Sequence, residues 1–224
     1  MLHLLYFITR KSTITDSEFH RYWREVHGPI AKKIEQIKRY AQSHRIAFSG
    51  MDSSYDGVAE VWLENETAMM TLRQNPEYLQ GALADEPNFI DMNRVEWMAT
   101  NDHVILDGPQ TSTQAKLIFQ LKRKSGMSLT DARQYWIDVH GPIVCRLPGL
   151  RRYIQCHLVD AAYNYAEPKW DGVAQLWVDD VAAMQKMLES SEFKQAAWPD
   201  GEKFLDLSLA SSFVAQEHHV VWPT

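Results

Sequence analysis

The chain has 224 residues, 45% of them apolar and 23% charged, and its formal net charge is −6. These values are typical of a globular protein and argue against a disordered or fibrous chain. They predict no nucleic-acid partner, because nucleic-acid binders usually carry a basic excess or a basic stripe. No apolar run approaches the ~20 residues that span a bilayer, so we also expect no membrane partner.

The first residues and the two cysteines predict a cytoplasmic protein. In residues 1–11 the basic side chains follow the apolar stretch, which is the reverse of the order in a signal peptide. Cys145 and Cys156 form neither a disulfide framework nor a CxxC motif. We interpret each of them as a free thiol that packs like a small apolar residue.

A long segment of the chain is repeated. Residues 18–44 recur as residues 131–157, with the Tyr-Trp, His-Gly-Pro and Tyr-x-Gln-x-His groups in the same places. The segment DGVAEVW at 56–62 recurs as DGVAQLW at 171–177. Six of the nine histidines form matched pairs, which are His27 with His140, His44 with His157, and His103 with His218. The two copies therefore derive from a duplication.

The duplication sets the predicted domain organisation. We predict a first repeat at residues 1–106 and a second repeat at residues 115–224. The linker between them, residues 107–114, is rich in turn-forming residues. Each repeat then has about 110 residues, which is the size of a small domain.

The elements of one repeat follow from its hydrophobic pattern. Residues 4–10 alternate in the manner of a strand. A helix is expected to begin at Thr15, whose spacing to Glu18 is that of a capping box. The pair Gly28–Pro29 is expected to disrupt or kink this helix. The remaining predicted elements are strands at 39–46 and 58–63, a helix at 66–73, and a last strand between 95 and 106.

This βαββαβ order is that of the ferredoxin-like fold, in which helices cover one face of the sheet. The other face must also be buried, and the second copy supplies a partner for it. The predicted fold class is therefore α+β, with two ferredoxin-like repeats packed sheet on sheet or closed into one barrel. We expect Tyr40 and His44 to share an inward face with Glu60 and Trp62.

Three motifs together resemble the EthD domain family. They are F/A-x-x-Y-W-x-x-x-H-G-P, R-Y-x-Q-x-H and D-G-V-A-x-x-W, and each occurs in both repeats. The resemblance implies membership of the dimeric α/β-barrel superfamily, whose single-unit members pair as homodimers. It thus implies that this chain is an intramolecular dimeric α/β barrel, a monomeric pseudo-dimer, with further homodimerisation left open.

The same resemblance implies a class of activities. Relatives include muconolactone isomerases, aromatic polyketide cyclases and fungal polyketide decarboxylases, and neighbouring branches include cofactor-free quinol monooxygenases and haem proteins. In the isomerase and cyclase relatives, histidines in the barrel cavity are implicated in proton transfer. The candidates implied here are His27, His140, His44 and His157.

These histidines have both a catalytic and a structural interpretation. An imidazole beside a carboxylate makes a tuned base, and a phenol can donate to a developing oxyanion. We therefore expect His44 to act as a base supported by Glu60, while Tyr40 and His27 polarise a substrate carbonyl. In the alternative, the histidines bond the carbonyls that Gly-Pro frees or complete an interior hydrogen-bond network.

The two predicted half-sites differ. Glu60 is replaced by Gln175 in the second copy, so only the first repeat can hold the expected pair of His44 with a carboxylate. The inward-facing side chains of the sheet are the substrate-binding candidates, and these are Trp62, Trp177, Tyr153, Gln175 and Phe7.

We expect neither a metal nor a tightly bound cofactor. The sequence has no phosphate loop, no dinucleotide fingerprint and no G-x-S-x-G elbow. His218 and His219 have no third ligand at a recognised metal-binding spacing.

The first hypothesis for function is a cofactor-independent enzyme of the lyase or isomerase type. It would carry out isomerisation, dehydration, cyclisation or decarboxylation of a flat, oxygenated aromatic, polyketide-like or lactone substrate in the barrel cavity. The alternative is a non-catalytic ligand-binding or accessory protein of an oxygenase or degradation pathway. A haem-binding protein is a third, weaker hypothesis.

Overall fold

The computed structural model describes residues 1–223, so residue 224, the last of the predicted second repeat, lies outside the described residues. The first repeat has its elements in the predicted order: β1 (Leu2–Ile8), α1 (Asp16–Tyr22), α2 (Gly28–Ala31), β2 (Ile37–Arg45), β3 (Gly57–Leu63), α3 (Glu66–Leu72), α4 (Leu83–Asp85) and β4 (Glu96–Leu106). The second repeat has the same order: β5 (Ala115–Leu121), α5 (Leu129–Tyr135), α6 (Gly141–Val144), β6 (Leu150–Leu158), β7 (Gly172–Val178), α7 (Val181–Glu189), α8 (Trp198–Phe204) and β8 (Ser211–Val221).

The strands follow each other in the closed order β1-β3-β2-β8-β5-β7-β6-β4, and each is hydrogen-bonded to its neighbours. The α+β class, with two ferredoxin-like repeats whose strands form one barrel, is therefore confirmed. Every strand pair whose register is described is antiparallel. None of the helices within residues 1–223 is both long and apolar enough to cross a bilayer.

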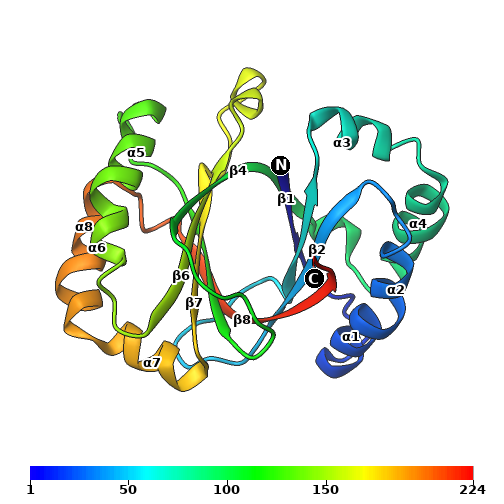
Figure 1. Ribbon diagram of the computed structural model, residues 1–224, viewed down its shortest axis with the longest axis horizontal. Helices are drawn as coiled ribbons and strands as arrows, with labels where there is room; N and C mark the ends of the chain where they lie inside the picture. The colour runs from blue at the N-terminus through cyan, green and yellow to red at the C-terminus, as the bar shows by residue number, and fades with distance from the viewer. Residues whose placement is uncertain (224) are drawn as a thin grey trace. The chain divides into compact units, whose positions relative to one another are not determined.

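The chain divides into two compact units that do not coincide with the two repeats. The first unit comprises Met1–Ile46, Ser53–Thr100 and Glu217–Thr224, and the second comprises Ala47–Asp52 and Asn101–Gln216. Each unit thus includes the end of a strand, β8 or β4, that begins in the other unit. Within the first unit, helices α1 to α4 lie on one face of the sheet, and within the second, helices α5 to α8 do the same (Figure 1).

The helix after β1 begins as expected but does not end at Gly28. Thr15 and Glu18 form both hydrogen bonds of the capping box. Near Gly28–Pro29, where a disruption or a kink was expected, regular α-helix gives way to a π-helical turn, Trp23–His27, which carries the chain directly into α2. In this wider turn the Gly28 N–H donates to the Trp23 carbonyl, and Pro29 lies in the first turn of α2, where a missing N–H costs little.

The DGVA motif joins the strands to this helix. Asp56 accepts hydrogen bonds from the Arg10 backbone N–H at 2.8 Å and from the Arg45 guanidinium at 3.1 Å. A Cβ atom on Gly57 would lie 2.6 Å from the Ser43 carbonyl oxygen and 2.6 Å from Cζ3 of Trp23. Glycine is therefore required at this position because the indole ring lies directly on the strand backbone.

Candidate active site

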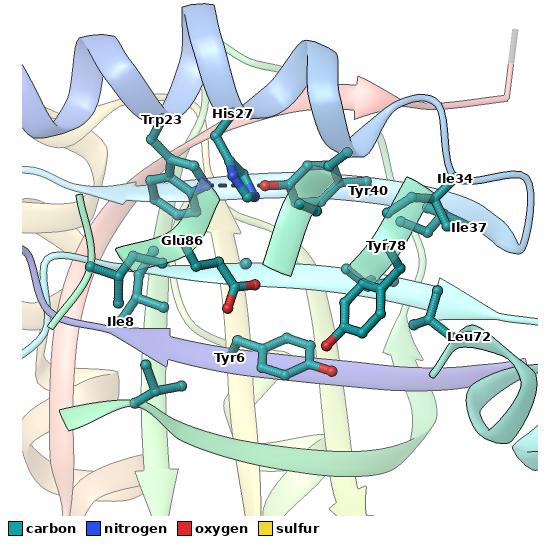
Figure 2. A pocket seen from close by; sticks show the side chains of 16 residues that line it. Tyr6, Ile8, Trp23, His27, Ile34, Ile37, Tyr40, Leu72, Tyr78 and Glu86 are labelled. Carbon is teal, nitrogen blue, oxygen red and sulfur yellow. Dashed lines mark hydrogen bonds between the residues drawn. The ribbon is translucent and has the colours of Figure 1, made fainter. Parts of the chain in front are cut away.

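A cavity lies between the sheet and the helices of the first unit (Figure 2). It has a volume of about 70 Å³ and is partly open to solvent. This is well above the roughly 10–15 Å³ that a cavity needs to hold one water molecule, so it accommodates a small ligand or the reacting end of a larger one. Its polar lining comes from Trp23, His27, Tyr40, Tyr6, Tyr78 and Glu86.

Strand β2 directs its polar side chains toward this helix-covered face. Tyr40 pairs with Val61, and Gln42 pairs with Ala59. Directly paired residues share a face of the sheet, and Ala59 and Val61 line the cavity beside the helices. The expectation that Tyr40 and His44 face away from the helices is therefore wrong, because alternation along a strand does not specify which face is which.

A hydrogen-bond network fixes Tyr40. Its hydroxyl oxygen accepts from Trp23 Nε1 at 3.0 Å and from Gln42 Nε2 at 3.1 Å. The same Gln42 amide donates to the Trp23 carbonyl at 2.8 Å, which ties the π-helical turn to β2. A phenol has two acceptor lone pairs and one donor. Since both lone pairs are used, the Tyr40 O–H remains as a donor at the cavity wall.

His44 belongs to the same network and does not line the cavity. Its Nε2 lies 3.2 Å from Gln42 Oε1, and its Nδ1 lies 2.8 Å from His20 Nδ1. Because the Gln42 amide nitrogen is already the donor in two other bonds, Nε2 of His44 must donate to Oε1. Burial, followed by the nearby His20, lowers the pKa of His44 to about 2. His44 is therefore a neutral side chain with both ring nitrogens engaged.

The predicted pair of His44 and Glu60 is wrong. Glu60 pairs with Ala41, one residue out of step with Tyr40 and Gln42, and so lies on the opposite face of the sheet. There it accepts a hydrogen bond from Ser43 Oγ, and its other oxygen lies 3.5 Å from His3 Nε2.

A histidine–aspartate pair forms one side of the cavity. His27 Nδ1 lies 3.0 Å from Asp85 Oδ2 and donates to it. Tyr22 and Asn88 donate to the other oxygen of Asp85, at 2.6 and 3.0 Å. Burial lowers the pKa of His27 against the opposing effect of Asp85, so the ring is neutral and its Nε2 is unprotonated. Burial alone would raise the pKa of Asp85, but the hydrogen bonds from Tyr22, Asn88 and His27 outweigh it and keep Asp85 ionised.

Glu86 is a carboxylate that the sequence analysis did not single out. It lies at the start of the short turn Glu86–Asn88 after α4. Figure 2 shows its carboxylate pointing into the space that Tyr6, Tyr78, Tyr40 and His27 surround. No other side chain within residues 1–223 forms a hydrogen bond with it. Burial, followed by the charge of Asp85, raises its pKa to about 7.

Two phenols lie near this carboxylate. Tyr6 comes from β1 and Tyr78 from the π-helical turn Glu77–Ala82. Burial raises the pKa of both phenols, and the charge of Glu86 adds to the effect. Each hydroxyl therefore keeps its proton at neutral pH and can serve as a donor to a bound oxygen.

A second cavity occupies the equivalent place in the second unit. It has a volume of about 90 Å³, and His140 and Tyr153 line it. His140 Nδ1 lies 2.9 Å from Asp200 Oδ2, and Tyr153 accepts from Trp136 at 2.8 Å. The positions of Tyr6, Tyr78 and Glu86 are taken here by Phe119, Phe193 and Gly201.

The other predicted site residues line neither cavity. Trp62 stacks on His3 with ring centroids 4.0 Å apart, and Phe7 packs against Tyr55. Trp177 is fully buried with the Lys116 ammonium 4.5 Å from its ring centroid. The remaining two residues, Gln175 and His157, are also buried.

His157 repeats the arrangement of His44. Its Nε2 lies 3.2 Å from Gln155 Oε1, and its ring stacks on Trp136. Burial lowers its pKa to about 3. Of the candidates named from the sequence, the structure therefore brings His27 and Tyr40 to the first cavity and His140 and Tyr153 to the second.

The first cavity offers few ligand atoms for a metal. Its side chains supply the Glu86 carboxylate and one free nitrogen of His27, whereas a catalytic zinc site usually has three protein ligands. A cavity of about 70 Å³ is also too small for a porphyrin, so it does not fit the haem hypothesis.

Comparison with known proteins agrees with this architecture. The EthD domain matches the chain twice, at residues 11–93 and 124–208. The dehydratase ustZ of Ustilaginoidea virens is 29% identical over 105 residues, which cover 41% of this chain and 75% of that protein.

Solved structures share the fold at low sequence identity. An anthrone oxidase-like protein has a TM-score of 0.67 at 9% identity, covering 98% of this chain and 93% of that chain. A mutant chlorite dismutase from Candidatus Nitrospira defluvii has a TM-score of 0.57 at 8% identity, covering 98% and 92%. At such identities the likeness shows the fold alone. The double domain match covers most of the chain, and the chain therefore belongs to the EthD domain family.

Proposed function

We propose that this chain is a small-molecule enzyme that transfers protons in the first cavity, with Glu86 as the general base. The observation that supports this most is a carboxylate that has no hydrogen-bond partner among residues 1–223, points into a cavity and has a pKa of about 7. A base works best when its pKa lies near the working pH. A carboxylate without a hydrogen-bond partner in a cavity lowers the free energy of unfolding, so a functional role accounts for it better than a structural one.

The surrounding groups fit an elimination of water from a β-hydroxy carbonyl compound. Glu86 takes a proton from the carbon next to the carbonyl, and the Tyr40 O–H donates to the oxygen on which negative charge develops. Protonated Glu86 then returns that proton to the departing hydroxyl. One C–H and one C–O bond break, one C=C bond forms, and water leaves.

His27 has a positioning role in this scheme. Its Nδ1–H is held by Asp85, so its unprotonated Nε2 can accept a hydrogen bond from a substrate hydroxyl. This bond would hold the hydroxyl within reach of Glu86. The same set of groups could return the proton to another carbon, which is an isomerisation.

The lining of the cavity and the similar dehydratase both support one class of substrate. The cavity wall is mostly apolar, with aromatic rings and the polar groups of Tyr6, His27, Tyr40, Tyr78 and Glu86, which suits a flat, oxygenated ring. The similarity to dehydratase ustZ favours dehydration over the other proton transfers. An aromatic or polyketide-like substrate, a cytoplasmic location and a monomeric pseudo-dimer stay predictions.

The test uses 3-hydroxy-1-tetralone, which loses water to give 1-naphthol, a product detected by fluorescence. We expect Glu86→Gln to lower kcat/KM by ~10²–10⁴-fold, while Glu202→Gln, at an exposed acid, leaves it unchanged. The wild-type rate should fall as the pH drops below about 7. An unchanged rate in Glu86→Gln would remove the assignment. Binding without turnover would favour the non-catalytic alternative.

A further inference from the structure

We propose that the second cavity is a separate binding site for a compact, uncharged carbonyl compound that places one ring in the cavity, which holds it without turnover. This inference does not depend on whether the first cavity is catalytic. It follows from what the second cavity has kept of the shared architecture and from what it has lost.

The body of the ligand must be apolar. Leu117, Phe119 and Leu121 from β5 form one wall, and Phe193 and Trp198 form part of another. A volume of about 90 Å³ that is partly open to solvent admits a single ring, with any remainder at the opening. Burial of that ring against these side chains supplies the affinity.

The ligand must also present one acceptor oxygen. The Tyr153 hydroxyl accepts from Trp136 Nε1 at 2.8 Å and from Gln155 Nε2 at 3.1 Å. Both lone pairs are used, so its O–H is left to donate into the cavity. A carbonyl oxygen of the ligand is the group that satisfies this donor.

A charge on the ligand is disfavoured. Among the described residues that line this cavity there is no carboxylate, lysine or arginine. The one titratable histidine, His140, is held by Asp200, and burial lowers its pKa, so it is neutral. A buried ion here would have no partner, which is costly.

The absence of turnover follows from Gly201, which stands where the first cavity has Glu86. A Cβ atom on Gly201 would meet only Cε1 of His140, at 3.7 Å, which is an ordinary contact. The position therefore has space for a side chain that the sequence does not supply. Without a carboxylate at this point, the base left beside a bound carbonyl compound is the neutral His140, whose basicity burial lowers.

The test is ¹⁹F NMR titration of the full chain with 4′-fluoroacetophenone as the neutral probe and 4-fluorobenzoate as its charged analogue. Gly201→Leu fills the cavity, and Gly201→Ala is the matched control, because one methyl group fits at this position. We expect the wild type and Gly201→Ala to bind the ketone equally, and Gly201→Leu to bind it at least ~10-fold more weakly. Binding of 4-fluorobenzoate in this cavity is not expected, so Gly201→Leu should leave its titration unchanged.

Equal ketone binding by the wild type and Gly201→Leu would overturn the proposal, as would benzoate binding that Gly201→Leu abolishes. Ala197→Leu, on another wall of the cavity, repeats the test if Gly201→Leu does not fold. Turnover of 3-hydroxy-1-tetralone by Gly201→Leu should equal that of the wild type. Failure of this proposal therefore leaves the assignment of Glu86 untouched, and the reverse also holds.

Discussion

Trp23, Tyr40 and Gln42 form the same hydrogen bonds in the first repeat as Trp136, Tyr153 and Gln155 form in the second. The distances agree within 0.2 Å, with 3.0 against 2.8 Å for the tryptophan–tyrosine bond. The histidine–aspartate pair is also present in both. These contacts hold the helices on the sheet, so both copies need them.

The two cavities differ at three positions where the first has an ionisable or hydroxyl-bearing side chain. The residues at the positions of Tyr6, Tyr78 and Glu86 in the second repeat are Phe119, Phe193 and Gly201. The second repeat folds in the same way without these polar groups. The comparison therefore separates residues that the fold requires from residues that only chemistry would require.

The largest expected effect tests whether the histidine–aspartate pair acts in one cavity only. His27→Asn should lower kcat/KM for 3-hydroxy-1-tetralone by ~10²-fold, because the substrate hydroxyl loses the acceptor that positions it beside Glu86. His140→Asn, the matched change in the second repeat, should leave it unchanged. Steady-state kinetics of both variants provide the measurement. Equal losses would mean that the pair is structural or that both cavities are active.

The next effect concerns stability and pH. The pKa of Glu86 in the folded protein, about 7, lies above its ordinary value of 4.5, so the folded state binds the proton more tightly than the unfolded state. The free energy of unfolding of the wild type therefore falls as the pH rises from 4.5 to 7. Above pH 7, Glu86→Gln should therefore be more stable than the wild type by about 3 kcal/mol. Below pH 4.5 the two should be equal. Urea unfolding at pH 4 and pH 8 measures this, and a constant difference would contradict the raised pKa.

A smaller effect tests the shared network. Tyr40→Phe and Tyr153→Phe each remove an acceptor for two buried donors, so each should cost about 1–3 kcal/mol in the free energy of unfolding. The two losses should be similar, yet only Tyr40→Phe should lower turnover. Chemical denaturation and kinetics on the same samples test both parts. Full activity in Tyr40→Phe would exclude the phenol as the donor to the substrate.

The smallest effect comes from giving the first cavity the residues of the second. Tyr6→Phe and Tyr78→Phe should each lower kcat/KM by roughly 3- to 10-fold, the value of one hydrogen bond. Neither should change the thermal midpoint by more than about 2 °C, since no other described side chain hydrogen-bonds to either hydroxyl. A large drop in stability would show that these phenols are structural.

Much of the fold could be predicted from the sequence, because the duplication shows the order of elements twice. The sequence does not predict which face of β2 lies against the helices. Alternation places Tyr40, Gln42 and His44 together, but the side they occupy depends on the pairing of Tyr40 with Val61, which no local pattern specifies. Because the wrong face was assigned, His44 was expected to lie beside Glu60 in the site.

Glu86 was missed for a different reason. It follows an aspartate in a stretch of short turns that has no regular period, so no pattern assigns its direction. A signal was nevertheless present in the comparison of the repeats. At the position of Glu86 the copy has glycine, whereas the adjacent Asp85 and Asp200 agree.

The contact between Trp23 and Gly57 also constrains how related sequences can vary. A Cβ atom on Gly57 would clash with both the Trp23 indole ring and the Ser43 carbonyl oxygen, so glycine is required at this position even where the tryptophan changes. The same holds for Trp136 and Gly172. In an alignment of single-repeat relatives, we expect the glycine to be kept even where a smaller side chain replaces the tryptophan, because the strand carbonyl oxygen still excludes a Cβ atom.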